Sequence, residues 1–197
     1  MYENKVITEP KWKSWIIQTT TPLFTPEQCQ QIIASGRAQK PQQAQVGMGK
    51  PKGGTDTKKR VTTISWIPVK EMKHMYQDLN TFIQKANENH FGFGDIQVTE
   101  QAQFTEYPEG GFYDWHMDCD VNMEHEPPVR KISMTVLLND PSEFEGGDLE
   151  LMAPGKFATL KQGHAICFAS FLNHRVNPVT RGMRQSLVVW FGGKAFR

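Results

Sequence analysis

The chain has 197 residues and a formal net charge of +1, with 22 Lys or Arg against 21 Asp or Glu. This balance excludes a strong overall attraction to nucleic acid or to a membrane surface. The length suits a single domain with a sizeable core, and no apolar run approaches the roughly 20 residues of a membrane-spanning helix. The cysteines, Cys29, Cys119 and Cys167, are widely spaced and odd in number, which argues against a disulfide framework and for a reducing, cytoplasmic location.

The first half of the chain predicts two helices among strands. Aromatic and β-branched residues mixed with threonines predict a strand over residues 12–24. Thr25 then offers an N-cap, and Gln28 completes a capping box three residues later. The helix that follows is expected to end near Gly36. A second helix is expected over residues 70–89, because its apolar residues recur at steps of three and four.

Between the two predicted helices, residues 38–59 are rich in Gln, Gly, Lys and Pro and show no apolar period. We therefore expect a mobile surface loop. The stretch from Lys50 to Arg60 carries five basic residues and one acidic residue, a local net charge of +4. One interpretation is a solvated loop. The other is a flap that closes over an acidic or extended substrate, because long loops without regular structure are often functional.

The second half of the chain predicts many short strands separated by turns rich in Gly, Pro and Asp. Helices followed by many short strands are typical of two packed antiparallel sheets, a jelly roll or sandwich, with the helices on one side. The predicted fold class is therefore α+β, mainly β. It is one domain over residues 1–197, with a supporting region over 1–95 and a β core over 96–197. Strands are expected at residues 61–67, 96–107, 132–138, 148–152, 156–160, 165–169, 174–179 and 186–191.

One stretch, YPEGGFYDWHMD at residues 107–118, ends in a histidine and a carboxylate two residues apart. On an extended strand, residues i and i+2 project to the same face, so His116 and Asp118 would lie side by side. Such a pair supplies two ligands of a 2-His-1-carboxylate site, which suits non-haem Fe(II) and leaves positions open for substrate and oxygen. His174 is the expected third ligand, because a jelly roll brings distant strands together.

Arg184 starts the apolar strand that runs to Phe191. A cation that points into the mouth of a β-barrel is costly unless it meets an anion. A guanidinium binds a carboxylate through two parallel hydrogen bonds, so we expect Arg184 to hold a dicarboxylic co-substrate whose other end reaches the metal. Each of these residues alone could be structural, but the ordered set of H-x-D, His and Arg favours an iron site.

A polar, proline-containing segment follows the H-x-D pair, over residues 119–129. It is interpreted as a solvated loop on the substrate side. The alternative is a second metal site built from Glu124, His125 and Glu126.

Further motifs accompany the candidate ligands. They are Tyr107-Pro108, Gly110 to Tyr113, Leu138 to Asp140, Glu145 to Leu149, His174 to Arg184 and Trp190. With them, the segment from about 104 to 193 resembles the 2-oxoglutarate/Fe(II)-dependent dioxygenases, in particular the prolyl 4-hydroxylase-like branch and its bacterial PKHD-type hydroxylases. The resemblance covers nearly half of the chain closely and the N-terminal half loosely.

The resemblance implies a double-stranded β-helix, which is a cupin-like jelly roll. It implies Fe(II) as the metal, 2-oxoglutarate and O2 as co-substrates, and ascorbate as an accessory reductant. The implied iron ligands are His116, Asp118 and His174. Arg184 is then the partner of the 5-carboxylate of 2-oxoglutarate.

The resemblance also implies hydroxyl groups around the co-substrate. Tyr107 matches a tyrosine that reaches this region in related prolyl hydroxylases. Other relatives add a second hydroxyl from a strand tyrosine, at a position that is Leu137 here. Thr135, one strand period away, or Ser186 would replace it.

The implied reaction is hydroxylation of a C–H bond, with decarboxylation of 2-oxoglutarate to succinate and CO2. Asp118 favours hydroxylation, because halogenating relatives carry a small residue at that position. The favoured substrate is a prolyl or other residue of a peptide or protein. The alternatives are a free amino acid or other small molecule, nucleic-acid demethylation suggested by the basic run, and a non-catalytic metal-binding scaffold. No membrane partner is expected.

Overall fold

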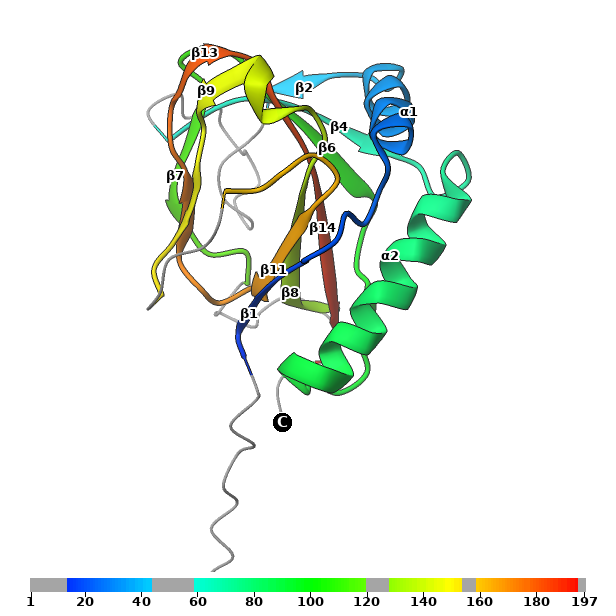
Figure 1. The fold of residues 1–197 in the computed structure, drawn as a ribbon. Helices are drawn as coiled ribbons and strands as arrows, with labels where there is room; N and C mark the ends of the chain where they lie inside the picture. Colours follow the sequence, from blue (N-terminus) through cyan, green and yellow to red (C-terminus); the bar gives the residue numbers. More distant parts are fainter. Residues whose placement is uncertain (1–13, 44–58, 120–127, 154–158, 195–197) are drawn as a thin grey trace, which may run out of the picture.

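The structure, a computed structural model, describes residues 14–43, 59–119, 128–153 and 159–194. Two antiparallel sheets face each other, and two helices cover the outer side of the larger sheet (Figure 1). This is the predicted double-stranded β-helix with supporting helices. No helix in these four ranges is long and apolar enough to cross a membrane.

The larger sheet, here the main sheet, has eight strands in the order β1-β11-β8-β14-β6-β4-β2, with β5 also paired to β14. Every pairing in it is antiparallel. Its strands are β1 (Ile16–Gln18), β2 (Gln42–Gln43), β4 (Thr63–Ile67), β5 (Gln97–Val98), β6 (Ala102–Tyr107), β8 (Val129–Leu137), β11 (Ala165–Ala169) and β14 (Arg184–Gly193).

The central strands of the main sheet divide their side chains between two faces with a period of two. On β14, Leu187 and Val189 join the core beneath the helices, whereas Val188 and Trp190 line a cavity on the opposite side. The core beneath the helices holds Ile32, Ile33, Leu79, Ile83, Phe104, Ile132, Met134, Val136, Leu187, Val189 and Phe191.

The helices that cover this core are α1 (Pro26–Arg37) and α2 (Lys73–Ala86), and α2 continues as the π-helix η1 (Asn87–Phe91). The capping box at Thr25 is confirmed. The predicted helix end near Gly36 is one residue early, because α1 ends at Arg37. Gly36 instead allows close packing, since a Cβ there would lie 2.3 Å from Cγ of Phe104.

The smaller sheet has four strands in the order β10-β12-β7-β3. Its strands are β3 (Arg60–Val61), β7 (Phe112–His116), β10 (Leu149–Leu151) and β12 (His174–Val176). Beside it lie the short helix η2 (Pro141–Glu143) and a separate pair, β9 (Phe144–Gly146) and β13 (Val179–Gly182). Side chains from both sheets line one shared cavity, so the functional residues lie between the sheets.

Several predicted strands are shorter or divided. The strand expected over 12–24 is only β1 within the described residues, and the threonine-rich part after it continues beside β11 without regular pairing, through hydrogen bonds from Thr19 to Ala165 and from Leu23 to Gly163. The strand expected over 61–67 is two strands, since β3 joins the smaller sheet and β4 the main sheet. The strand expected over 96–107 is likewise β5 and β6.

Two predicted loops are described only in part. In the loop expected at 38–59, residues 42–43 form β2, which pairs with β4, so the prediction of a loop is wrong for these two residues. Residues 44–58 of that loop and residues 120–127 of the segment at 119–129 lie outside the described residues, as does most of the strand expected at 156–160.

Candidate metal centre

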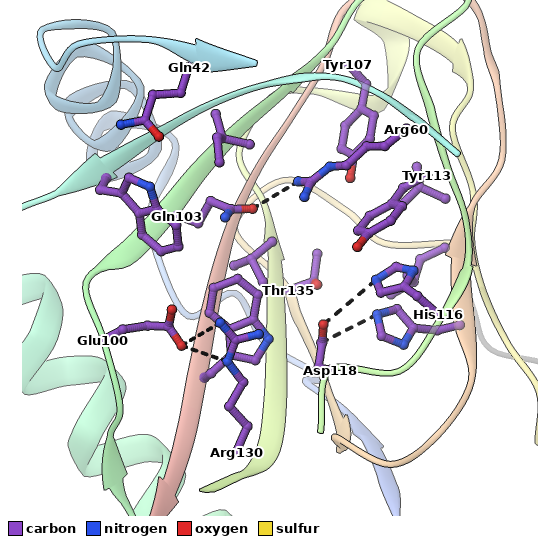
Figure 2. Close-up of a pocket in the computed structure, with 17 residues that line it drawn as sticks. Gln42, Arg60, Glu100, Gln103, Tyr107, Tyr113, His116, Asp118, Arg130 and Thr135 are labelled. Atoms are coloured by element: carbon purple, nitrogen blue, oxygen red, sulfur yellow. Dashed lines mark hydrogen bonds and ion pairs between the residues drawn. The ribbon is translucent and has the colours of Figure 1, made fainter. Parts of the chain in front are cut away.

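The three predicted ligands meet between the two sheets (Figure 2). One ligand atom each from His116, Asp118 and His174 lies within 4.8 Å of the others. Nε2 of His116 is 3.8 Å from Oδ1 of Asp118, and Nε2 of His174 is 3.5 Å from Oδ2. Among the residues that the structure describes, no other group of three His, Cys, Asp or Glu side chains converges in this way.

Pairing in the smaller sheet brings the two histidines together. His116 is the last residue of β7, His174 is the first residue of β12, and the two are directly opposite in the antiparallel register. Asp118 lies two residues beyond the end of β7, so the alternation of side chains along a strand does not explain why it faces the histidines. Instead, the backbone N–H groups of Asp118 and Cys119 both donate to the carbonyl of Ser170 at 3.0 Å.

Both imidazoles present Nε2 to the centre. Nδ1 of His116 lies 2.7 Å from the carbonyl of Asp114, and Nδ1 of His174 lies 3.0 Å from that of Leu172. Each Nδ1–H therefore donates to the backbone, and the Nε2 lone pair is left for a metal. Burial, reinforced by the neighbouring His174, lowers the pKa of His116 to about 4, so the ring is neutral at pH 7 as a metal ligand must be.

Asp118 supplies the negative charge. Its burial would raise its pKa, but the two imidazoles, the hydroxyl of Ser133 and the indole of Trp190 outweigh that effect and hold the pKa below its ordinary value. Two imidazole nitrogens and one carboxylate are the donor set that suits Fe(II). The residues present thus fit a divalent iron ion.

These ligands form one wall of a cavity of about 320 Å³. The opposite wall comes from the inner face of the main sheet. The polar and aromatic lining residues include Gln42, Arg60, Trp66, Glu100, Gln103, Tyr107, Tyr113, Arg130, Thr135 and Trp190 (Figure 2).

Two arginines contribute to this cavity in different ways. Nε and Nη2 of Arg130 both donate to Oε1 of Glu100 at 2.7 Å, and the guanidinium lies 3.8 Å from the ring centre of Trp190. The charge of Arg130 is therefore compensated. The sequence analysis did not identify this pair, because nothing along the chain joins a residue at the start of β8 to one before β6.

Arg60 is only partly satisfied. Its Nη2 donates to Oε1 of Gln103 at 3.1 Å, and its guanidinium lies 4.3 Å from the ring centre of Tyr113. Its Nε is buried without a hydrogen-bond partner among the described residues. Tyr113 in turn stacks on His116, with ring centres 3.5 Å apart. In the sequence Arg60 was visible only as the end of the basic run.

Arg184 lines a neighbouring cavity of about 430 Å³, and Leu149 lines both cavities. The side chain of Arg184 is buried, donates through Nη1 to Ser186 Oγ at 3.1 Å, and lies 5.5 Å from the ring centre of Tyr107. Burial lowers the pKa of Arg184, although Tyr107 and Asp148 act against this. No carboxylate of the described residues lies within 4.0 Å of it, so the guanidinium has no direct ion-pair partner there.

The candidates for a second hydroxyl near Arg184 are separated by the structure. Ser186 contacts the guanidinium, and Leu137 lines the same cavity, whereas Thr135 lines the cavity of the metal ligands. The position beside Arg184 that Gly147 occupies requires a glycine. Gly147 has a φ of +68°, and a Cβ there would lie 2.8 Å from Cδ of Arg184.

Comparison with known proteins agrees with this geometry. Residues 102–192 match the model of the 2OG-Fe(II) oxygenase superfamily. A PKHD-type hydroxylase of Colwellia psychrerythraea is 34% identical over 148 residues, which cover 72% of this chain and 65% of the relative. A PKHD-type hydroxylase of Teredinibacter turnerae is 35% identical over 118 residues, 56% of this chain and 52% of the relative. The chain thus spans less than two thirds of these curated relatives.

Solved structures share the fold. The viral collagen prolyl hydroxylase of Paramecium Bursaria Chlorella virus-1, in complex with 2OG, has a TM-score of 0.69 at 18% identity, covering 90% of this chain and 96% of that one. A prolyl-4-hydroxylase of Pseudomonas putida has a TM-score of 0.67 at 20% identity, covering 92% and 94%. A prolyl hydroxylase of Trichoplax adhaerens, in complex with a hypoxia inducible factor peptide fragment, has a TM-score of 0.65 at 18% identity, covering 90% and 83%.

The fold, the His-Asp-His geometry and the sequence match all agree with the same superfamily of oxygenases. The superfamily that the sequence matches is named for 2-oxoglutarate and Fe(II), and the His-Asp-His geometry fits the iron ion. Residues 102–192, which contain His116, Asp118, His174 and Arg184, are thus similar in sequence to the 2OG-Fe(II) oxygenase superfamily.

Proposed function

We propose that the protein is an Fe(II)- and 2-oxoglutarate-dependent hydroxylase that acts on a prolyl or other residue of a peptide or protein. The observation that carries the proposal is the convergence of His116, Asp118 and His174 on the wall of a cavity. The relatives that are PKHD-type hydroxylases and the structural neighbours that are prolyl hydroxylases support it.

Nε2 of His116, Nε2 of His174 and the carboxylate of Asp118 would hold the metal. When bound, Fe(II) together with 2-oxoglutarate and O2 supplies the oxidation, in which the co-substrate yields succinate and CO2 and one oxygen atom enters a substrate C–H bond. The contribution of the protein is to position the reactants and to keep water out of a buried site.

Arg184 would bind the 5-carboxylate of 2-oxoglutarate. A buried guanidinium without a carboxylate partner is costly, and an incoming carboxylate offsets that cost through two charge-assisted hydrogen bonds. Ser186 fixes the guanidinium from one side. Tyr107 and Thr135 line the metal cavity and offer hydroxyl groups toward the same co-substrate.

The substrate would occupy the rest of the metal cavity. Its wall presents aromatic rings, which suit an apolar ring such as that of proline, and two donors that lack a partner among the described residues, Nε of Arg60 and Nε1 of Trp190. A carbonyl oxygen of a peptide would satisfy such a donor. The peptide-bound structure of the Trichoplax adhaerens relative supports a peptide as the substrate class.

The test incubates the purified protein with Fe(II), 2-oxoglutarate and O2 against a library of proline-containing peptides and a set of free amino acids. Mass spectrometry should find peptides that gain one oxygen atom only when 2-oxoglutarate is present, and succinate should form with them. The His116→Ala variant should form neither product. Oxidised amino acids without oxidised peptides would favour a small-molecule substrate, and absence of succinate in the wild type would indicate a non-catalytic scaffold.

A further inference from the structure

Ser133 places a hydroxyl beside the carboxylate of the metal site. It lies on β8 between the apolar residues Ile132 and Met134 and is fully buried. Its Oγ donates to Oδ2 of Asp118 at 2.7 Å. Behind it, Oγ of Ser170 lies 3.0 Å away and completes a chain of hydrogen bonds. A buried hydroxyl in an apolar strand is costly unless such bonds satisfy it.

Ser170 also holds the backbone of Asp118 in position. The carbonyl of Ser170 accepts hydrogen bonds from the N–H groups of Asp118 and Cys119, and the N–H of Ser170 donates to the carbonyl of Lys131. β8, the end of β11 and the turn after β7 therefore meet at the two serines. Together the serines determine both where Asp118 lies and how its carboxylate is turned.

The two carboxylate oxygens have different surroundings. Each oxygen faces one histidine, Oδ1 at 3.8 Å from Nε2 of His116 and Oδ2 at 3.5 Å from Nε2 of His174. Only Oδ2 accepts a hydrogen bond from the described residues, that of Ser133. Close to the same carboxylate, the indole N–H of Trp190 is buried and has no partner in hydrogen-bond geometry in the described part of the chain. The oxygen that is free of hydrogen bonds is the better placed one for a metal.

We propose that Ser133 is a positioning residue that makes Asp118 a one-oxygen ligand: Oδ2 stays with Ser133 and Oδ1 binds the metal. This inference rests on the proposed function. A facial triad leaves half of an octahedral coordination shell open, and a chelating keto acid with O2 fills that half. A second oxygen from Asp118 would take one of those positions. The hydrogen bond of Ser133 opposes this, because it occupies Oδ2 and fixes the direction of its lone pairs.

The first test measures Mn(II) affinity, because Mn(II) accepts the same ligands and its binding is readily followed by electron paramagnetic resonance without turnover. Residues that only orient a metal ligand typically contribute about 10–100-fold to affinity, so Ser133→Ala should weaken Mn(II) binding about tenfold or more. Ser65→Ala is the matched control. Ser65 is also a buried serine with one short hydrogen bond, at 2.6 Å to the carbonyl of Gly36, but it lies on the helix side of β4.

The second test measures 2-oxoglutarate affinity with Mn(II) at saturating concentration, by calorimetry. Ser133→Ala should weaken this binding, because the freed Oδ2 competes for a coordination position. Ser133→Cys keeps the volume of the side chain and offers only a weak donor, so it should show the same losses if Ser133→Ala folds poorly. Thermal unfolding of each variant reports folding separately.

The outcomes separate the inference from the proposed function. Ser133 variants that bind Mn(II) and 2-oxoglutarate as tightly as Ser65→Ala would overturn the inference and leave the metal site intact. A loss of Mn(II) affinity with unchanged 2-oxoglutarate affinity would refute the one-oxygen role of Asp118. A wild-type protein that binds neither Mn(II) nor 2-oxoglutarate would overturn the proposed function itself.

Discussion

The two faces of the main sheet bury polar groups in opposite ways. On the helix side, the buried hydroxyl of Tyr76 donates to the carbonyl of Ile67 and accepts from the N–H of Ala102, both at 2.6 Å. On the side of the metal cavity, Nε of Arg60 and Nε1 of Trp190 have no partner among the described residues. The main sheet therefore separates a side where the chain itself supplies these partners from a side where two buried donors remain open to ligands.

Because of this difference, residues that determine stability and residues that bind ligands lie on opposite sides of the main sheet. Polar groups on the helix side are satisfied internally, which is the usual condition of buried polar atoms. The open donors of Arg60 and Trp190, and the buried guanidinium of Arg184 without an ion pair, would gain partners when a ligand binds. A substitution on one face should thus change the free energy of unfolding, and a substitution on the other should change ligand affinity.

The largest expected effect follows from His174→Ala. It removes a metal ligand outright, so the loss of Mn(II) affinity should exceed the roughly 10–100-fold contributed by residues that only orient a ligand. Equilibrium dialysis or electron paramagnetic resonance measures it. His164→Ala, a half-buried histidine that hydrogen-bonds Thr19 away from the triad, is the control. Equal Mn(II) affinity in the two variants would show that the triad is not the metal site.

Arg184→Met should come next. Loss of a buried, charge-assisted pair costs about 2–5 kcal/mol, so the 2-oxoglutarate affinity should fall on the order of 100-fold. Removing a buried charge that has no direct ion-pair partner should not lower the free energy of unfolding of the ligand-free protein. Calorimetry and urea unfolding measure the two quantities. Arg181→Met, at an exposed arginine paired with Glu145, is the control, and equal 2-oxoglutarate affinity in both variants would contradict the assignment.

Leu187→Ala tests the opposite face of the same strand. Leu187 is fully buried beneath the helices, and such truncations cost about 2–5 kcal/mol of unfolding free energy. Metal affinity should stay within about twofold of the wild type, since additivity holds for distant, independent sites. Urea unfolding and Mn(II) titration check both values. A large loss of metal affinity would mean that the two faces are not independent.

The smallest expected effect concerns Cys29, in the helix-side core. Burial raises the pKa of its thiol to about 11, so the folded protein keeps the thiol protonated while the unfolded chain ionises it near its ordinary pKa of about 8.5. Stability that is present below that pH should decline as the pH rises toward 11, by on the order of 1 kcal/mol. Cys29→Ala should flatten this part of the profile of unfolding free energy against pH. An identical slope in both proteins would show that the Cys29 thiol does not contribute to the pH dependence of stability.

The fold class was predicted from the sequence, and so were the features that short local motifs specify. The capping box at Thr25 specifies a helix start by itself. The H-x-D pair was predicted to share a strand face, yet β7 ends at His116 and Asp118 is held by Ser170. The prediction that the two lie close together is confirmed, although the physical reason for it was wrong.

What the sequence could not predict depends on contacts between distant residues. β8 reads as an apolar run, and both of its faces are buried, so the period alone does not tell which face meets a cavity. Ser133 and Ser170 form a pair only in three dimensions. A serine inside an otherwise apolar strand was the one available signal, because a buried hydroxyl requires a partner.

The direct opposition of His116 and His174 has a further consequence. β7 and β12 are far apart along the chain, and an ion held between their ends would join them as a reversible cross-link. Binding to the folded state alone stabilises it by about 2.7 kcal/mol when free metal is a hundred times its dissociation constant. A higher concentration of available iron would then raise the free energy of unfolding of the protein as well as the occupancy of its site.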